Sequence, residues 1–279
     1  MASNQHNSYG PGHAIPHVKH HEWRTAENSA THLIAHLQSG AAQNPKVRVL
    51  DVGAGSGTIT ASLAKYIPEG HIVATDISDD ILKRAKFHVD KEGIKNISYQ
   101  KASVYELPFA NSSFDITHAH QVLTHLDAPV DAIREMLRVT KPGGIVSLRE
   151  VDMAMWCWWP ELPALQLFHE TLVKSMVDNG GSGNAGRQLL SWSMKADVPR
   201  ENIEMTFGTW CHCLPEDRES MADSMIERLR FGPMRVRAIE RGIATEKDID
   251  SMMEAWEKWK VTEDAVLGQT SGEAIIRKA

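Results

Sequence analysis

The sequence of 279 residues has few cysteines, and they form no paired framework. Cys157, Cys211 and Cys213 are all there are, which fits a reducing compartment rather than a disulfide scaffold. The run Cys211-His212-Cys213 has a spacing that suggests a metal, but structural zinc sites use a longer gap and a second ligand pair, which the sequence lacks. We therefore expect no metal site.

Long apolar runs and an excess of basic charge are also missing. No stretch reaches the roughly 18 apolar residues of a membrane span, and the polar N-terminus lacks the apolar segment of a secretory signal. The formal net charge of -6 disfavours nucleic acid as the main partner, because phosphate binding needs a basic face. We expect a cytoplasmic protein with neither membrane nor nucleic-acid partners, and the sequence does not fix its oligomeric state.

The hydrophobic fraction of 42% is sufficient for a proper core, and the length allows one elaborated α/β domain. Residues 1–22 are rich in Asn, His, Gly and Pro without periodicity, which predicts a flexible N-terminal arm. Residues 23–279 are then the folded domain.

The chain is organised around a glycine turn that follows a short apolar run. The run includes Asp51, and Gly53, Gly55 and Gly57 follow at alternate positions before residues 58–67, which have helical composition. A strand, a glycine turn and a helix in this order form a nucleotide-binding corner, because glycine lets the backbone approach a ligand closely. A tight turn that binds nothing is the structural alternative.

The glycine spacing separates this turn from a dinucleotide-binding one. The pattern G-x-G-x-x-G would need a glycine at position 58, where the sequence has Thr58. A nicotinamide dehydrogenase shares the strand, the turn and an acid for the ribose, but the spacing disfavours it.

Asp76 is the candidate partner of a ribose. It ends the expected strand 71–75, about 20 residues past the turn, where an acid commonly binds the two ribose hydroxyls. The alternative is that Asp76 serves the next helix. Ser78, Asp79 and Asp80 already look like a cap with first-turn acids, so we favour the ribose role.

The rest of the chain repeats a strand–turn–helix rhythm, which predicts a doubly wound, mostly parallel sheet. We expect the helical insertion at about 211–262 to cover the site as a lid. The expected helices are 23–38, 129–139, 163–178, 216–230 and 246–261. The expected strands are 97–100, 114–118, 145–149, 203–210 and 273–277, the last of them antiparallel. We also expect a turn at 141–144 and a flexible loop at 180–186.

Five sequence segments occur along the chain in this order: LDVGAGSGTIT, ATDIS, LPF with SFD, HAHQVLTHL and RVTKPGG. Together they resemble class I S-adenosylmethionine-dependent methyltransferases of the ubiquinone/menaquinone-biosynthesis type, above all their small-molecule relatives. The resemblance implies a seven-stranded sheet in which the last hairpin inserts one antiparallel strand. It also implies S-adenosylmethionine as cofactor and methyl transfer to a small, apolar or aromatic molecule.

The resemblance further implies which residues bind the cofactor. Asp76 would hold the ribose, Ile77 would pack on the adenine, and Ser103 with Val104 would lie beside it. Ser103 departs from the family, which usually has an acid there, and a hydroxyl accepts less strongly than a carboxylate. The residues expected around the methionine part of the cofactor and at its methyl-transfer end are Asp51, Gly53, Ala54, Gly55, Gly57, His120 and Gln121.

A general base is needed only if the acceptor must lose a proton. His120, His125 and Glu150 are the candidates, with a structural role as the alternative for each. A second alternative is a regulatory protein that binds the cofactor without methylating, which intact glycines do not exclude.

Candidate substrate contacts are aromatic or polar residues outside these motifs. A tryptophan cluster could wall a pocket for a flat molecule or simply be core, and Arg187 could anchor a polar group or begin a solvated helix. The candidates are His20, His21, Trp156, Trp158, Trp159, Arg187 and Trp210.

Overall fold

The computed structural model describes residues 22–279. Most of the arm expected at 1–22 therefore lies outside the described residues. Glu22 is described, and its Oε1 lies 2.5 Å from Nη2 of Arg84 and 3.0 Å from Nε2 of His88, both on helix α5. The start of the described chain is thus attached to the helical layer beside the glycine turn.

The sheet has eight strands, and the expected doubly wound, mostly parallel arrangement is confirmed. Its order is β3-β2-β1-β4-β5-β8, with β8 antiparallel to β5 and β7 paired along the other edge of β8. The strands are β1 Arg48–Val52, β2 His71–Asp76, β3 Ile97–Lys101, β4 Phe114–His120, β5 Thr140–Val151, β6 Cys157–Trp159, β7 Ile203–His212 and β8 Val266–Arg277.

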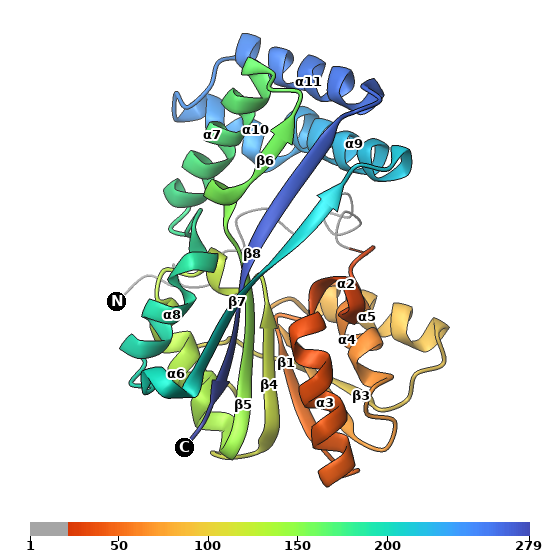
Figure 1. The fold of residues 1–279 in the computed structure, drawn as a ribbon, viewed down its shortest axis with the longest axis vertical. Helices are drawn as coiled ribbons and strands as arrows, with labels where there is room; N and C mark the ends of the chain where they lie inside the picture. Colours follow the sequence, from red (N-terminus) through yellow and green to blue (C-terminus); the bar gives the residue numbers. More distant parts are fainter. Residues whose placement is uncertain (1–21) are drawn as a thin grey trace.

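Helices cover both faces of this sheet (Figure 1). Leu33, Leu37 and Leu63 belong to a core on one face, while Ile133 and Leu189 belong to a second core on the other. The helices are α2 Ala26–Ser29, α3 Thr31–Gln43, α4 Thr58–Ala64, α5 Asp79–Lys91, α6 Pro129–Val139, α7 Pro163–Asp178, α8 Ala185–Lys195, α9 Pro215–Phe231, α10 Pro233–Glu240 and α11 Glu246–Val261.

Several expected boundaries were wrong. The helix expected over 23–38 is two helices, because Ala30 leaves the helical region with φ -141°. The sheet has one strand more than the seven expected, since β6 adds a short antiparallel pair to β8. The last strand begins at Val266, seven residues before the expected start, because β7 pairs with β8 as far as Leu267.

The turn expected at 141–144 lies within strand β5. It forms an irregularity there: Phe114 pairs with Thr140 and Ile116 with Ile145, so extra residues of β5 bulge out. Gly143 adopts φ +77°, and backbone hydrogen bonds with Lys278 keep the bulge attached to the end of β8.

Helices α7, α9, α10 and α11, with β6 and the ends of β7 and β8, form a cap above the sheet (Figure 1). The cap has its own hydrophobic core, in which Phe168 of α7 packs edge-on against Trp256, 5.2 Å between ring centroids. The cap is therefore larger than the insertion expected at about 211–262. Among residues 22–279, no helix is both long and apolar enough to cross a membrane.

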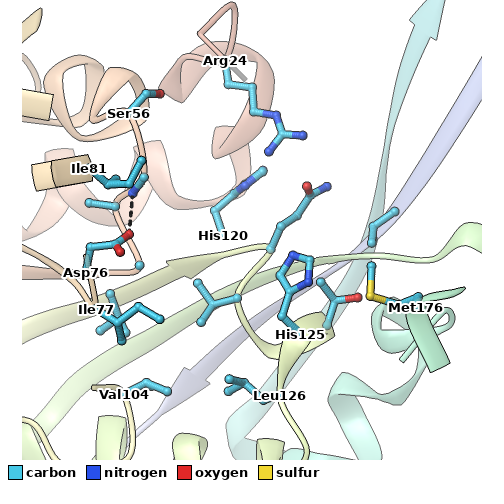
Figure 2. Close-up of a pocket in the computed structure, with 18 of the residues that line it drawn as sticks. Arg24, Ser56, Asp76, Ile77, Ile81, Val104, His120, His125, Leu126 and Met176 are labelled. Atoms are coloured by element: carbon cyan, nitrogen blue, oxygen red, sulfur yellow. Dashed lines mark hydrogen bonds between the residues drawn. The ribbon is translucent and has the colours of Figure 1, made fainter. Parts of the chain in front are cut away.

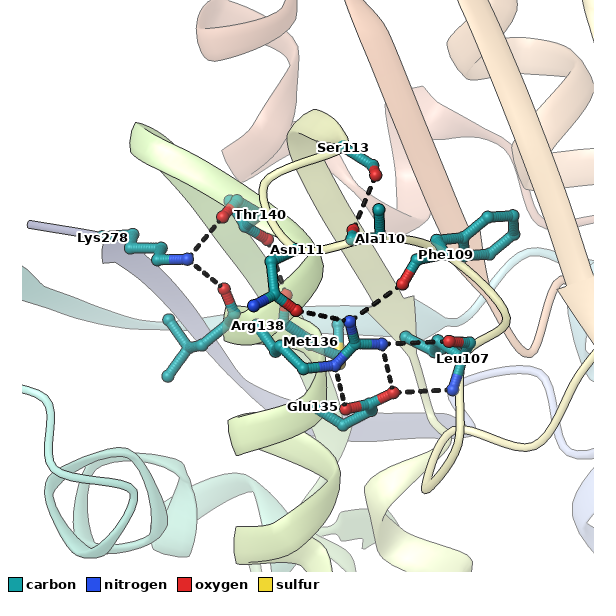
Figure 3. Close-up of polar contacts among 11 residues, drawn as sticks. Leu107, Phe109, Ala110, Asn111, Ser113, Glu135, Met136, Arg138, Thr140 and Lys278 are labelled. Carbon is teal, nitrogen blue, oxygen red and sulfur yellow. Dashed lines mark hydrogen bonds and ion pairs between the residues drawn. The ribbon is translucent and has the colours of Figure 1, made fainter.

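At the opposite end of the sheet, Arg138 of α6 fastens the loop that precedes β4 (Figure 3). Its guanidinium donates to the backbone oxygens of Leu107 and Phe109, to Asn111 and to both carboxylate oxygens of Glu135 at 2.7–3.0 Å. Lys278 closes the same end by donating to the carbonyls of Leu137 and Thr140 at 2.7 and 2.6 Å.

We expect Arg138→Ala to lower the free energy of unfolding by about 2 kcal/mol, because several charge-assisted hydrogen bonds are lost together. Urea denaturation followed by circular dichroism measures this. Arg277→Ala is the control, since its ion pair with Glu204 is exposed on both sides and should be worth less than about 1 kcal/mol. Equal effects of the two substitutions would contradict the interpretation.

Candidate functional site

A cavity of about 310 Å³ opens at the carboxyl ends of β1, β2 and β4 and continues under the cap. This is the edge at which open α/β sheets bind ligands. The structure brings most of the expected site residues to its wall: Asp51, Gly53, Ala54, Gly55, Asp76, Ile77, Ser103, Val104, His120, Gln121, His125, Trp156 and Trp210. Gly57, Glu150, Trp158, Trp159 and Arg187 are not part of that wall, and His20 and His21 lie outside the described residues.

The three glycines of the turn have different tasks, although all have positive φ. A Cβ on Gly53 would lie 2.5 Å from a methyl of Val122, and one on Gly57 would lie 2.7 Å from Cβ of Ala85. These two allow close packing of the turn against its neighbours. A Cβ on Gly55 would meet no atom within 4 Å, so its backbone faces the open cavity.

Asp51 is buried and already hydrogen-bonded within the protein. Its Oδ1 lies 2.9 Å from Nδ1 of His118, and its Oδ2 accepts from the hydroxyl of Thr60 at 2.5 Å. The carboxylate therefore ties β1 to β4 and α4 beneath the turn, and its contribution to the cavity is to hold the turn in shape.

Asp76 ends β2 at the cavity wall (Figure 2). Its Oδ2 accepts from the amide of Gly55 at 3.2 Å and its Oδ1 from the amide of Ser78 at 3.0 Å. Each oxygen of a carboxylate can accept more than one hydrogen bond, which is the chemistry that a pair of hydroxyl donors requires. Beside it lies a set of apolar side chains, Ile77, Ile81, Val104 and Leu126.

Glu150 is fully buried and lies behind the wall of the cavity rather than on it. Its carboxylate accepts from the backbone amides of Val122, Leu123 and Thr124 at 2.9–3.0 Å. Burial raises the pKa of Glu150 to about 8, and the three amide donors oppose that rise. This candidate base is therefore a support for the loop after β4, in which Gln121 has a left-handed φ of +53°.

His120 and His125 do face the cavity, and both are held neutral (Figure 2). Burial is the main cause in each case. It lowers the pKa of His120 well below its ordinary value, with help from the charges of Arg24 and Arg149. It lowers the pKa of His125 to about 4, with help from Arg228 and Arg24. Both imidazoles are weak bases at neutral pH.

The tryptophans divide between the cavity and its surroundings. Trp156 and Trp210 line it, whereas Trp158 borders a separate small cavity behind Trp156. Trp159 is 51% exposed and donates to Asp264. Arg187 is not a cavity residue. It is exposed in the first turn of α8, as the helix-start alternative has it, and its guanidinium forms a two-point ion pair with buried Asp152 at 2.7 Å.

The glycine-rich segment expected as a flexible loop at 180–186 is hydrogen-bonded to the wall. The backbone amide of Ser182 donates to the carbonyl of Thr124 at 2.8 Å, and the carbonyl of Ser182 accepts from the hydroxyl of Thr124 at 2.7 Å. The carbonyl of Gly183 accepts from the amide of Met153 at 2.8 Å. The segment thus joins the loop after β4 to the floor of the cap.

The cap contributes residues that sequence patterns did not predict. Arg228 of α9 and Arg237 of α10 line the cavity, as does Arg24 before α2, which is 9% exposed with its Cζ 4.8 Å from the ring of Trp210. Helical periodicity indicated only which faces of these helices are buried. The apolar wall under the cap consists of Val151, Met153, Trp156, Leu172, Met176, Met225 and Met234.

The three cysteines are exposed thiols. Within residues 22–279, no three His, Cys, Asp or Glu side chains come together in a way that could hold a metal ion.

The sequence matches the family described as a methyltransferase domain over residues 43–204. It is 33% identical over 268 residues to an uncharacterized methyltransferase of Schizosaccharomyces pombe, covering 92% of each chain. It is 30% identical over 279 residues to a probable methyltransferase of Aspergillus luteorubrus, covering 95% of each. A ubiquinone/menaquinone biosynthesis C-methyltransferase of Ectopseudomonas mendocina is 36% identical over 139 residues, 49% of this chain and 52% of that one.

Solved structures share the fold. A candidate methyltransferase from Bacillus halodurans superposes with a TM-score of 0.55 at 22% identity, covering 88% of this chain and 99% of that one. A phosphoethanolamine N-methyltransferase from Haemonchus contortus, bound to phosphomonomethylethanolamine and S-adenosylhomocysteine, gives 0.56 at 17% identity, covering 94% of this chain and 57% of that one.

Buried neutral histidines predict loss of stability in mild acid. The folded-state pKa is about 3 for His32, about 4 for His125 and well below 6.5 for His120, so protonation favours the unfolded chain. Their contribution is complete above pH 6.5 and is lost as pH falls toward 4, by roughly 1.4 kcal/mol per pH unit for each group. Urea midpoints at pH 6.5 to 5 measure the slope. His125→Phe should reduce it, and a flat profile in the wild type would contradict the assignment.

Glu150→Ala should lower the free energy of unfolding by roughly 3 kcal/mol, because three buried amides lose their acceptor. Hydrogen exchange should accelerate at residues 122–124 more than in the sheet. Glu204→Ala, which removes an exposed carboxylate, is the control. Unchanged protection of that loop would show that Glu150 does not support it.

Proposed function

The chain belongs to the S-adenosylmethionine-dependent methyltransferases, and we propose that one cavity receives the cofactor at the glycine turn and a small, largely apolar acceptor under the cap. The observation that carries this proposal is the continuity of the cavity from Gly55 and Asp76 to the apolar wall of α7, α9 and α10. Two reactants bound in one enclosure are aligned and shielded from water, which is the main task of a protein when the cofactor supplies the reactive group.

The residues at the glycine turn fit S-adenosylmethionine. The open space over Gly55 admits a ligand close to the backbone, Asp76 can accept from both ribose hydroxyls, and Ile77 with Val104 offers apolar surface to an adenine. When bound, the cofactor supplies an electrophilic methyl group on a sulfonium. We assign Arg24 to the carboxylate of its amino-acid part, because Arg24 is buried at the cavity wall on the side of His120 (Figure 2).

The residues around the acceptor orient it and exclude water. Four methionines, Met153, Met176, Met225 and Met234, line this half, and their flexible thioethers adapt to the shape of an apolar molecule. Trp156 adds a flat apolar surface. An enclosure of about 310 Å³ under a helical cap suits a small molecule better than a nucleic acid, whose backbone needs an open basic face.

Neutral His120 and His125 have a positioning task in this proposal. With the pKa of His125 at about 4, its imidazole takes a proton from the acceptor only weakly at neutral pH. Both rings instead present hydrogen-bonding nitrogens at the boundary between the two halves of the cavity.

Asp76→Ala should weaken binding of S-adenosylhomocysteine by about 100-fold in titration calorimetry, because the ribose loses two charge-assisted hydrogen bonds. Asp79→Ala is the matched control: it removes an exposed carboxylate of the following helix, which pairs with Lys101. Wild-type affinity in the Asp76 variant would refute the ribose assignment, and equal loss in both variants would make the effect a structural one.

A further inference from the structure

The two halves of the cavity differ in charge. Among the described residues that line it, the acidic side chains are Asp51 and Asp76, and both belong to the half at the glycine turn. The half under the cap has Arg228 and Arg237 in its wall.

The two cap arginines come from different helices that meet at one corner. Arg228 lies in the last turn of α9, and Arg237 lies in α10, which begins directly after Gly232. Both side chains are partly buried, and Met225 and Met234 from the same two helices line the cavity with them. Two guanidinium groups therefore border a largely apolar enclosure, where the attraction between opposite charges is stronger than in water.

The field of Arg228 reaches the loop between the two halves. Its positive charge is, after burial, the largest cause of the lowered pKa of His125, and Arg24 adds to it. His125 lies on the cavity beside Met176 of α7 (Figure 2). Arg228 and His125 thus line the same cavity.

We infer that the acceptor is an organic acid: a small apolar body with an oxyanion group, bound by Arg228 and Arg237. This inference rests on the proposed function, since it names the class of molecule that enters the half of the cavity under the cap. Arginine suits the task because its planar fork donates two parallel hydrogen bonds to a carboxylate or phosphate. The methionines and Trp156 cover the apolar body. The oxyanion fixes the orientation of the acceptor relative to the glycine turn.

Titration calorimetry with matched acid and amide pairs tests the inference. The probes are benzoate and benzamide, 2-naphthoate and 2-naphthamide, with 2-naphthyl phosphate as a second oxyanion, added to protein with and without saturating S-adenosylhomocysteine. At least one acid should bind about tenfold or more tightly than its amide. Tighter binding of the naphthyl phosphate than of the carboxylate would identify a phosphate ester, and the reverse a carboxylic acid.

Arg228→Gln and Arg237→Gln should each reduce the preference for the acid by at least about tenfold and leave amide affinity within about twofold. Arg230→Gln, an exposed position of the same helix α9, should change neither. Binding of S-adenosylhomocysteine by each variant checks that it is folded, and either of the two cap variants suffices for the test.

If no acid binds more tightly than its amide, or if the preference survives both cap substitutions, the inference is wrong. A different result would contradict the proposed function, namely that the wild type does not bind S-adenosylhomocysteine. Because the preference for the acid over the amide is also measured without that ligand, the two failures can be told apart.

Discussion

A single buried carboxylate holds together the parts that surround the cavity. Glu150 at the end of β5 accepts three consecutive amides of the loop after β4. That loop then packs Val122 against Gly53 of the glycine turn and binds Ser182 below the cap through Thr124. Gln121, which directly precedes these amides, has a left-handed backbone and donates its own amide to the carbonyl of Arg149 at 2.7 Å. The loop that Glu150 supports thus contacts the turn on one side and the segment below the cap on the other, so the shape of the cavity wall between the two halves depends on this acceptor.

The cap turns an open sheet edge into an enclosure, and it is assembled from two separate parts of the chain. Helix α7 follows β5, whereas α9, α10 and α11 lie between β7 and β8, and they share one core around Phe168, Trp256 and Trp259. The division of charge in the cavity follows from this construction. The acids come from the strands of the sheet, and the cap arginines come from helices that the minimal fold does not need.

The fold and the glycine-turn half could be predicted from sequence because their signals are local. Gly55 and Asp76 occur at fixed offsets from a strand end, and those offsets determine where they lie in any doubly wound sheet. Arg228 and Arg237 could not be predicted in this way, because their access to the cavity depends on how α9 packs against α11 and α10 against α7. Arg187 had a chemically reasonable role, but a partner 35 positions away in the sequence, Asp152, determines its position.

Strand β8 lies between β5 and β7 although it is the last of the three to be synthesised. Until residues 266–277 leave the ribosome, both neighbouring strands present open edges of backbone amides and carbonyls, which are prone to pair with other chains. The sheet cores and the cap core also lack Ile276 and Leu267 until that moment. The nascent protein therefore passes through a stage in which β5 and β7 exist without the strand that lies between them, and during that stage it has to be kept from aggregating.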